Sequence, residues 1–535
     1  MNNRRYILII ILAGIAAYLT SFQNSFVWDD IGLITINPYI KSWKHIGDIF
    51  TSFLYHKTGE GGIFYRPIVS LSFLIDYSIW KENPVGYHLT NLILHVTNAI
   101  LVYKIILVLF KKEKLGLFTA LIFLVHPIHT EAVTYISGRA DPIVTLFMLS
   151  SLFMFITYGS QNEFWKMFCA IAFYILAMLT KEYAIIFILL LAAYGFCFKP
   201  KIKLRHYLIF FAISLIYGLM RLALLKNETG VFLFKQNMNM PHLLLVISRS
   251  FTEYLRLLLF PINLHYQREL YIPSSIFQPI GILSIAIPLA FILFVIIFRK
   301  KKPVLFGSIW FIVGLIPYQS ALQLNAIVSE HWLYLPSIGF FLVISGLLLS
   351  PKADKEKRVV PYILLVFIVI AGIALTNSQS RYWKNEITLY NYILKFRPNE
   401  PRVHNNLGNA YATEGRYENA LLHFKKALEI APNYSTAYFN MGAVYLEKQH
   451  FYTAATQFQK TLTLNPSYTK ARSYLADTYN RLGVTYYKQK NYPKARELWI
   501  KALKIYPGYS KSKKNLESLR NPKKSDCYSI SNTLK

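Results

Sequence analysis

The chain has 535 residues, of which 54% are apolar and only 16% are charged. This composition is too apolar for a soluble enzyme of that length, and several apolar runs reach the roughly 17–25 residues that a helix needs to cross a bilayer. A net charge of +31 would suggest nucleic acid in a soluble protein, but many basic residues cluster between the apolar runs and no nucleic-acid motif accompanies them. We therefore expect a multi-span membrane protein up to about residue 376, and no nucleic-acid partner.

Short basic clusters at residues 4–5, 111–114, 199–205, 299–302 and 352–358 set the expected topology. Basic residues beside membrane spans stay in the cytoplasm, so each interval between clusters must hold an even number of spans. The eleven predicted spans are residues 6–23, 87–110, 115–126, 142–158, 166–180, 183–198, 207–225, 276–298, 303–317, 335–350 and 359–376. The first is expected to be an uncleaved span, because its small-residue cleavage pattern is unconvincing. The N-terminus is then cytoplasmic, and the chain after the last span lies outside.

This topology places several polar segments on the outer face. They are the FVWDDIG loop (26–32), HPIHTEAVTYISGRADP (126–142), the turn at 180–182, the outer loop 226–275 and SEHWLYLPS (329–337). Within the outer loop, the run 242–260 carries Arg249, Glu253 and Arg256 on one helical face, so we expect that helix to lie along the interface rather than cross it. Polar groups that converge on one face of a bundle are a common sign of a ligand site.

The span 87–110 carries a polar stripe on an otherwise apolar helix. His88, Asn91, His95 and Asn98 are spaced three, four and three residues apart, so they share one face. Polar groups inside a bilayer usually face the bundle interior or a watery cavity. Two readings remain open: hydrogen bonds that join helices, and contact with a ligand by at least His88, the residue nearest the outer end.

From about residue 401 the chain repeats. Leu407, Gly408 and Tyr411 recur 34 residues later as Met441, Gly442 and Tyr445, and a third copy begins 41 residues after the second. This is the period and pattern of the tetratricopeptide repeat, which builds a helical solenoid with a concave binding surface. We expect a membrane domain over 1–380, a repeat domain over 398–510 (repeats 401–434, 435–468 and 476–509) and a polar, disordered tail over 511–535. The seven additional residues before the third copy are either an insertion or an extended helix.

Three cysteines, Cys169, Cys197 and Cys527, give neither a disulfide framework nor the spacing of metal ligands. No ligand cluster demands a metal, so the sequence requires neither a metal site nor a cofactor. A divalent ion is compatible with the sequence but not required by it.

The order of these motifs resembles a known family. FVWDDIG, GYHLTNLILH, HPIHTEAV followed by GRAD, LTKE and SEHWLYLPSIGF, ahead of a last span and repeats, look like the transmembrane-and-tetratricopeptide-repeat O-mannosyltransferases. These are GT-C-type glycosyltransferases, and the resemblance covers nearly all of residues 20–510. It implies an all-α fold in which a polytopic membrane bundle precedes an α-solenoid.

The resemblance implies transfer of a sugar, mannose in eukaryotic members, from a polyprenyl-phosphate carrier to a hydroxyl of a protein or glycan. A carboxylate in the first outer loop would act as general base, a position that Asp29 or Asp30 matches. We favour Asp29, because related motifs usually lead with the essential aspartate. The alternative is a solvated pair or a helix N-cap.

A phosphate leaving group needs cations. Lys181 and Arg139 are the candidates, although Lys181 could instead pair with Glu182 or extend to the interface, and Arg139 could pair with Asp141. His126 and His129 would contact the sugar, or else cap the helix that begins at Pro127.

Glu330, His331 and Tyr334 form the last predicted cluster. Relatives are expected to have Glu-Arg here, so His331 removes a permanent cation from this position but can still hydrogen-bond to phosphate or sugar. The alternative is a helix-start cluster at the interface. In the outer loop, Arg256 and Tyr266 would line the path of the lipid or the acceptor.

The expected location is a bacterial inner membrane with the repeats in the periplasm, where they would bind the acceptor or another protein. Three other functions compete with transfer from a polyprenyl phosphate. The first is a membrane-anchored repeat scaffold without catalysis, and the second is a ligase that moves an oligosaccharide from a lipid diphosphate. The third, a transporter, would favour inverted repeats or paired broken helices, which the sequence does not show.

Overall fold

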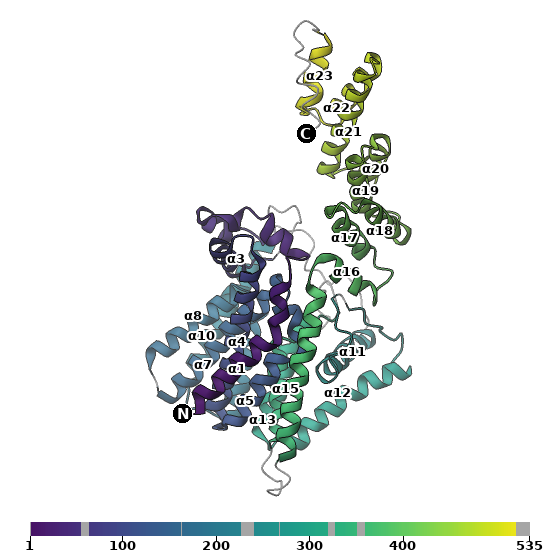
Figure 1. The fold of residues 1–535 in the computed structure, drawn as a ribbon. Coiled ribbons are helices and arrows are strands. Elements are labelled where there is room, and N and C mark those ends of the chain that lie inside the picture. The colour runs from purple at the N-terminus through teal and green to yellow at the C-terminus, as the bar shows by residue number, and fades with distance from the viewer. Residues whose placement is uncertain are drawn as a thin grey trace. The chain divides into compact units, whose positions relative to one another are not determined.

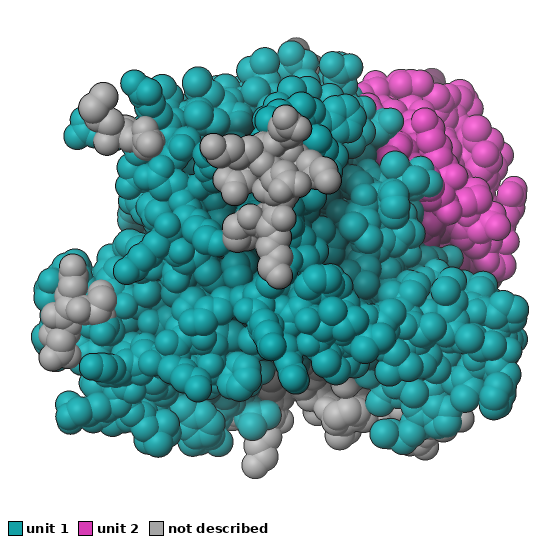
Figure 2. All heavy atoms as spheres, turned by 90° about the horizontal axis from the view of Figure 1, so that it is seen from below, with its two compact units in different colours: residues 1–385 teal, residues 386–535 magenta. Residues whose placement is uncertain are grey.

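The computed structural model describes residues 2–54, 64–161, 163–225, 240–266, 268–318, 327–349 and 359–520. Within these ranges the chain forms helices and no β-strand, which confirms the all-α prediction. The chain divides into two compact units, Met1–Asn385 and Glu386–Lys535 (Figure 2). The first unit holds the apolar helices and the second holds the repeats.

A helix lies at each of the eleven ranges predicted to span a membrane (Figure 1). These helices are α1 (Asn2–Tyr18), α4 (Pro84–Phe110), α5 (Glu113–Val125), α7 (Ala140–Gln161), α8 (Phe164–Met178), α9 (Phe187–Phe198), α10 (Leu204–Leu225), α12 (Pro279–Phe298), α13 (Lys302–Leu315), α14 (Pro336–Leu348) and α15 (Val359–Ser380). Among the described residues, six segments are long and apolar enough to cross a membrane on those grounds, and a bent pair beginning at Glu113 adds a seventh. The count of eleven spans stays a prediction.

The polar segments between these helices fold into short helical turns. They are η1 (Leu19–Gln23), η2 (Ile31–Thr35), η3 (Tyr39–Lys41), η4 (Trp43–His45), α2 (Ile46–Thr51), η5 (Pro127–His129), α6 (Thr130–Val133), η6 (Ile136–Arg139), η7 (Glu182–Ile186), η8 (Ile316–Tyr318), η9 (Glu330–Leu333) and η11 (Arg381–Trp383). The sequence analysis did not anticipate the helix α3 (Pro67–Trp80), whose apolar run is too short to span a bilayer.

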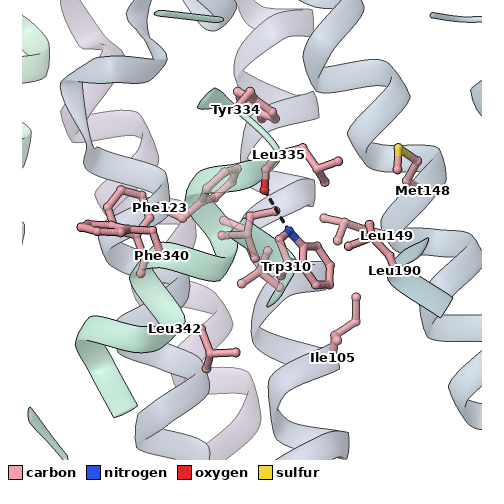
Figure 3. Close-up of a cluster of buried hydrophobic side chains, with 14 of the residues drawn as sticks. Ile105, Phe123, Met148, Leu149, Leu190, Trp310, Tyr334, Leu335, Phe340 and Leu342 are labelled. Atoms are coloured by element: carbon pink, nitrogen blue, oxygen red, sulfur yellow. Dashed lines mark hydrogen bonds between the residues drawn. The ribbon is translucent and has the colours of Figure 1, made fainter. Parts of the chain in front are cut away.

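The core of the membrane unit includes a close approach between α13 and α14. A Cβ atom added at Gly307 would lie 2.5 Å from the backbone oxygen of Gly339, so both positions require glycine. Beside this contact the indole N–H of Trp310 donates to the backbone oxygen of Leu335 at 3.0 Å (Figure 3). Small residues let helices pack closely where lipid offers no hydrophobic driving force.

The predicted interfacial helix is α11 (Met240–Leu259), which packs on α12. It is not among the described segments that are apolar enough to cross a membrane. Its charged stripe is present as predicted, with Glu253 between Arg249 and Arg256. Residues 226–239 of the predicted outer loop lie outside the described residues.

The repeat unit is a run of antiparallel helices. They are α16 (Glu386–Leu394), α17 (Pro401–Thr413), α18 (Tyr417–Ile430), α19 (Ser435–Glu447), α20 (Phe451–Leu464), α21 (Thr469–Lys488), α22 (Tyr492–Ile505) and α23 (Ser510–Arg520). Gly408 packs on Phe424, where an added Cβ would approach to 2.6 Å, and Gly442 packs in the same way on Phe458. Of the two readings of the longer third repeat, the extended helix is correct, because α21 has 20 residues where α17 and α19 have 13.

One prediction about the C-terminus is corrected. The tail expected to be disordered from residue 511 begins as helix α23. Ser512 and Asn515 on this helix are buried and hydrogen-bond to Asn480 of α21, at 3.1 and 2.9 Å. These polar contacts hold a segment whose composition looked solvated. Residues 521–535 lie outside the described part of the chain.

Candidate active site

The segments predicted to share the outer face do meet in the structure. Asn24 donates to the backbone of Ser380 at 3.0 Å, and Thr134 shares hydroxyl hydrogen bonds with Ser21 at 3.2 Å and Ser380 at 3.0 Å. The first loop, the 126–142 segment and the end of α15 therefore form one hydrogen-bonded layer.

Asp30 is fully buried in this layer and holds two segments together. One carboxylate oxygen accepts hydrogen bonds from the backbone N–H and hydroxyl of Ser137, at 2.8 and 2.5 Å. The other accepts from the backbone N–H of Val27 at 3.0 Å. Burial raises the pKa of Asp30 to about 7, against the lowering effect of these hydrogen bonds, and the neighbouring charge of Asp29 adds to the increase.

Asp29 has a different environment. It is half-buried, and its backbone N–H donates to the hydroxyl of Tyr135 at 3.3 Å. The preceding residue, Trp28, has φ of 53°, a left-handed conformation that is unfavourable for a bulky side chain. Such strain costs about 1–3 kcal/mol and persists only where the surroundings impose it, often at functional sites. The strained Trp28 therefore marks this turn as a candidate functional position.

The polar stripe of α4 faces the interior of the bundle, as predicted. Asn91 donates to the backbone of Val133 at 3.0 Å, and Asn98 donates to the backbone of Pro142 at 2.9 Å. His88 lies 3.2 Å from the backbone oxygen of Asn24 and is 3% exposed. All four side chains are buried, so the structure shows the stripe joining segments and does not show His88 open to a ligand.

Arg139, a candidate for binding phosphate, lies in a buried ion pair. Its guanidinium is fully buried and lies 2.6 Å from the carboxylate of Asp76 on α3. It also donates to the backbone oxygen of Tyr87 at 3.2 Å. The pairing with Asp141 that the sequence suggested as an alternative is not formed.

Lys181 pairs with Asp141, at 2.8 Å to both carboxylate oxygens, and not with Glu182. Its side chain is 9% exposed. Glu182 instead lies 3.2 Å from both Arg66 and Arg221. Arg139 and Lys181 are thus each neutralised by one buried carboxylate, and neither presents an available cation.

His126 directly precedes η5 and His129 is its last residue, and both are buried. The His126 ring accepts a hydrogen bond from the backbone N–H of Ile128 at 3.3 Å and donates to the backbone oxygen of Leu258 at 3.2 Å. The first of these bonds is the helix cap that the sequence suggested. His129 lies 3.3 Å from the hydroxyl of Ser337.

Glu131 organises the last predicted cluster. One of its carboxylate oxygens accepts from the backbone N–H groups of Glu330 and His331, each at 3.1 Å. The other accepts from the His331 ring at 2.6 Å. Tyr334 turns away from this cluster into the bundle, where its hydroxyl contacts His95 at 2.6 Å and Asn98 at 3.1 Å.

A permanent cation does lie beside Glu330, although it comes from a distant part of the chain. Arg268, in the loop after α11, contacts Glu330 at 3.1 Å and Glu253 at 3.5 Å. Glu253 also binds Arg256 at 2.7 Å and lies 4.0 Å from Arg249. We call Arg249, Arg256 and Arg268 the arginine cluster. Two carboxylates thus face three guanidinium groups.

Burial raises the pKa of Glu330 to about 8, and the charge of Glu131 adds to the increase, while Arg268 opposes it. Even with both carboxylates ionised, the three guanidinium groups leave the arginine cluster with an excess of positive charge.

Aromatic contacts connect this cluster with the first loop. The rings of Trp28 and Tyr266 meet edge to face with centroids 4.7 Å apart. The backbone N–H of His265, the residue before Tyr266, donates to Glu330 at 2.7 Å. The structure therefore links Asp29, Tyr266, Glu330, His331 and Arg256 through a chain of contacts, whereas Arg139 and Lys181 lie in separate ion pairs. No group of three side chains in the described residues could hold a metal ion.

Comparison with known proteins agrees with this architecture. Residues 67–222 match the family model described as dolichyl-phosphate-mannose-protein mannosyltransferase, and residues 401–434, 423–456 and 476–509 match tetratricopeptide-repeat models. Protein O-mannosyl-transferase F38B6.6 of Caenorhabditis elegans is 24% identical over 78% of this chain, and human protein O-mannosyl-transferase TMTC3 is 24% identical over 79%. The chain is a relative of the transmembrane-and-tetratricopeptide-repeat O-mannosyltransferases.

Mouse protein O-mannosyl-transferase TMTC2 shares a higher identity, 33%, over 36% of this chain. The chain spans 61% of the worm relative and 51% of the human one. Along this chain, the mannosyltransferase match precedes the matches to the repeats.

Sequence analysis missed several charged residues of this layer. Asp76 carries a charge within an apolar segment, a signal that a buried partner must exist. Glu131 lies in the polar segment 126–142, where a carboxylate is not unusual. Arg268 gave no such signal, because it lies in an irregular loop and only the fold brings it to Glu330. The expected Glu-Arg pair is therefore present in space but not in the sequence.

Proposed function

We propose that this chain is an integral-membrane glycosyltransferase that moves a sugar from a polyprenyl-phosphate carrier to a hydroxyl of a protein. The observation that carries the proposal is the position of Asp29, half-buried on a strained turn that contacts the loop of the arginine cluster. The names of the relatives support mannose as the sugar and a protein as the acceptor.

In this mechanism Asp29 accepts the proton of the acceptor hydroxyl as its oxygen attacks the anomeric carbon. The bond between that carbon and the phosphate oxygen breaks with inversion, and the phosphate keeps the electron pair. Asp30 holds the loop through Val27 and Ser137 and does not touch the substrate.

The arginine cluster binds the donor phosphate in this proposal. Arg256 and Arg249 are partly exposed, with 34% and 22% of their side chains accessible, and they lie on the helix predicted to follow the membrane interface. The phosphate of a carrier whose lipid tail lies in the bilayer is held at the membrane interface, where this helix is predicted to lie. Guanidinium groups can form paired hydrogen bonds with phosphate oxygens. Lys181 and Arg139 then support the fold through their ion pairs.

The outer face of a bacterial inner membrane is the proposed location, with the N-terminus in the cytoplasm and the repeats binding the acceptor or a partner in the periplasm. The asymmetry of the basic clusters supports this orientation.

Sugar transfer by the purified full chain tests the proposal. The donor is labelled polyprenyl-phosphate mannose and the acceptors are peptides that contain Ser and Thr. We expect Asp29→Asn to reduce transfer by about 10²-fold or more, the range of general-base catalysis, with an unchanged melting temperature. Asp30→Asn should instead lower the melting temperature, because an amide N–H₂ cannot accept both sets of hydrogen bonds.

For the donor site, Arg256→Ala should raise the KM for the donor, whereas the exposed Arg205→Ala, at the start of α10, should not. If the Asp29→Asn variant transferred the sugar as fast as the wild type, Asp29 would not be the general base. Transfer only from a lipid diphosphate would favour the ligase, and transfer from neither donor would favour the scaffold.

A further inference from the structure

The positive charge of the repeat unit is concentrated towards its C-terminal end, in helices α21 to α23. Residues 470–519 contain 12 Lys and Arg against 3 Asp and Glu, whereas residues 401–469 contain 6 against 4. The basic clusters between apolar helices are explained by membrane topology. That explanation does not reach residues 470–519, which belong to the repeat unit. An asymmetry of this size within one folded unit indicates a charged partner.

Most of these charges face solvent without a compensating acid. Of the twelve basic residues, ten are exposed, and only Arg481 and Lys494 are half-buried. Glu497 is occupied by Lys494 and Lys501 at 2.9 and 2.8 Å, and Asp477 is occupied by Arg481 at 2.7 Å. Within the described residues, no acidic group lies within 4.0 Å of the lysines of α23. We call seven of these exposed residues, from Lys488 to Lys514 and without the paired Lys501, the basic cap: Lys488, Lys490, Arg496, Lys504, Lys511, Lys513 and Lys514.

The fold holds the lysines of α23 close together although their like charges repel one another. Helix α23 is attached through the buried Ser512 and Asn515, which fixes Lys511, Lys513 and Lys514 on its outward side. Like charges so close together repel one another and weaken the helix. Neither the packing of the repeats nor the membrane topology requires three lysines at this place, so they are candidates for contact with a ligand.

The distribution of the charges indicates the shape of the ligand. The basic cap spans three successive elements, with Lys488 and Lys490 at the end of α21 and in the turn after it, Arg496 and Lys504 on α22, and three lysines on α23. On α22, Arg496 and Lys504 are eight residues apart and therefore point about 80° apart around the helix axis. A flexible chain can follow such a surface, whereas a flat membrane can touch only part of it. Lysine predominates, and lysine offers point charges in place of the bidentate geometry that a phosphate motif uses.

We propose that the basic cap binds an extended, acidic polypeptide segment, and that it recognises charge density more than sequence. This interaction goes beyond glycosyl transfer, and Asp29→Asn should leave it intact.

Binding of labelled peptides to the full chain in neutral lipid nanodiscs tests the proposal. We expect fluorescence anisotropy to show binding of a peptide that alternates Glu and Ser, and no binding of the matched peptide with Gln in place of Glu. Higher salt should weaken binding, since these charges are exposed.

The triple variant Lys511→Glu, Lys513→Glu, Lys514→Glu should weaken binding by about tenfold or more, and the corresponding triple Gln variant should weaken it less. The matched control is Lys425→Glu, Lys426→Glu, Lys460→Glu, which makes the same charge change at exposed positions of the first two repeats. Melting curves confirm that each variant is folded.

Equal losses in the two triple Glu variants would show a general charge effect and overturn the proposal. It would also be overturned if the full chain in neutral nanodiscs bound vesicles of phosphatidylglycerol through the basic cap but did not bind the acidic peptide.

Discussion

Two adjacent carboxylates illustrate how strongly position decides the role of a residue. Asp30 accepts three hydrogen bonds in a buried site, while Asp29, one residue earlier, follows a strained tryptophan and keeps partial access to solvent. The sequence offered a solvated pair or an N-cap as alternatives to catalysis. Asp30 is neither, because its carboxylate accepts from Val27, three residues earlier, and from Ser137 of another segment.

Arg139 and Asp76 provide a test of the buried ion pairs. Arg139→Met should destabilise the protein by about 3–5 kcal/mol, because it leaves a buried carboxylate without its cation. The double variant Asp76→Asn, Arg139→Met should recover much of the loss, since an asparagine oxygen can still accept from Thr90, as Asp76 does at 2.8 Å. The melting temperatures of the wild type, Asp76→Asn, Arg139→Met and the double variant measure the loss and its recovery. A double variant no more stable than Arg139→Met would contradict the pairing.

Glu330 provides a prediction about pH. Its pKa is raised from the ordinary 4.5 to about 8, so the folded protein holds this proton more tightly than the unfolded chain. The resulting stabilisation is complete below pH 4.5 and is lost as the pH rises towards 8.

Glu330→Gln cannot lose that proton. The melting temperature of this variant, relative to the wild type, should therefore increase between pH 5 and 8. Asn433→Gln, at an exposed turn of the repeats, changes no titratable group and should leave the pH dependence unchanged. A constant difference between Glu330→Gln and the wild type would contradict the raised pKa.

At the scale of elements, apolar runs predicted the main helices well because hydrophobic length is a local property of the chain. Helix α3 was missed because its apolar run is short. Helix α23 was missed because polar side chains such as Ser512, and not an apolar face, attach it to α21. At the site, the sequence identified the correct segments but assigned partners by proximity along the chain. Arg139 and Lys181 find their partners on other elements, and local sequence carries no information about those distances.

The close contact of α13 and α14 gives a prediction at the same scale. Gly339→Ala should lower the melting temperature, because the new methyl group meets the backbone of α13. The matched control is Gly218→Ala on α10, where nothing lies within 4 Å and alanine should stabilise the helix by about 0.5–1 kcal/mol. Equal effects at both positions would show that the helices can separate at little cost.

At the scale of the whole molecule, labelling of single cysteines tests the side of the membrane on which each unit is predicted to lie. A background of Cys169→Ser, Cys197→Ser, Cys527→Ser allows single cysteines to report it. We expect Asn433→Cys, in a turn of the repeats, to react with a membrane-impermeant maleimide in cells whose outer membrane alone is permeable. Lys112→Cys, between α4 and α5, should react only after the inner membrane is disrupted. The opposite pattern would invert the topology.

The pair formed by Asp141 and Lys181 also bears on how the protein is made. The two residues are 40 positions apart, at the start of α7 and just after α8, and each would be an unpaired charge if its helix entered the bilayer alone. Together they form a nearly neutral unit. In the predicted topology the translocation machinery would therefore release α7 and α8 as one hairpin, after the ribosome has synthesised both. Replacing either charge should delay membrane insertion even before it affects the folded protein.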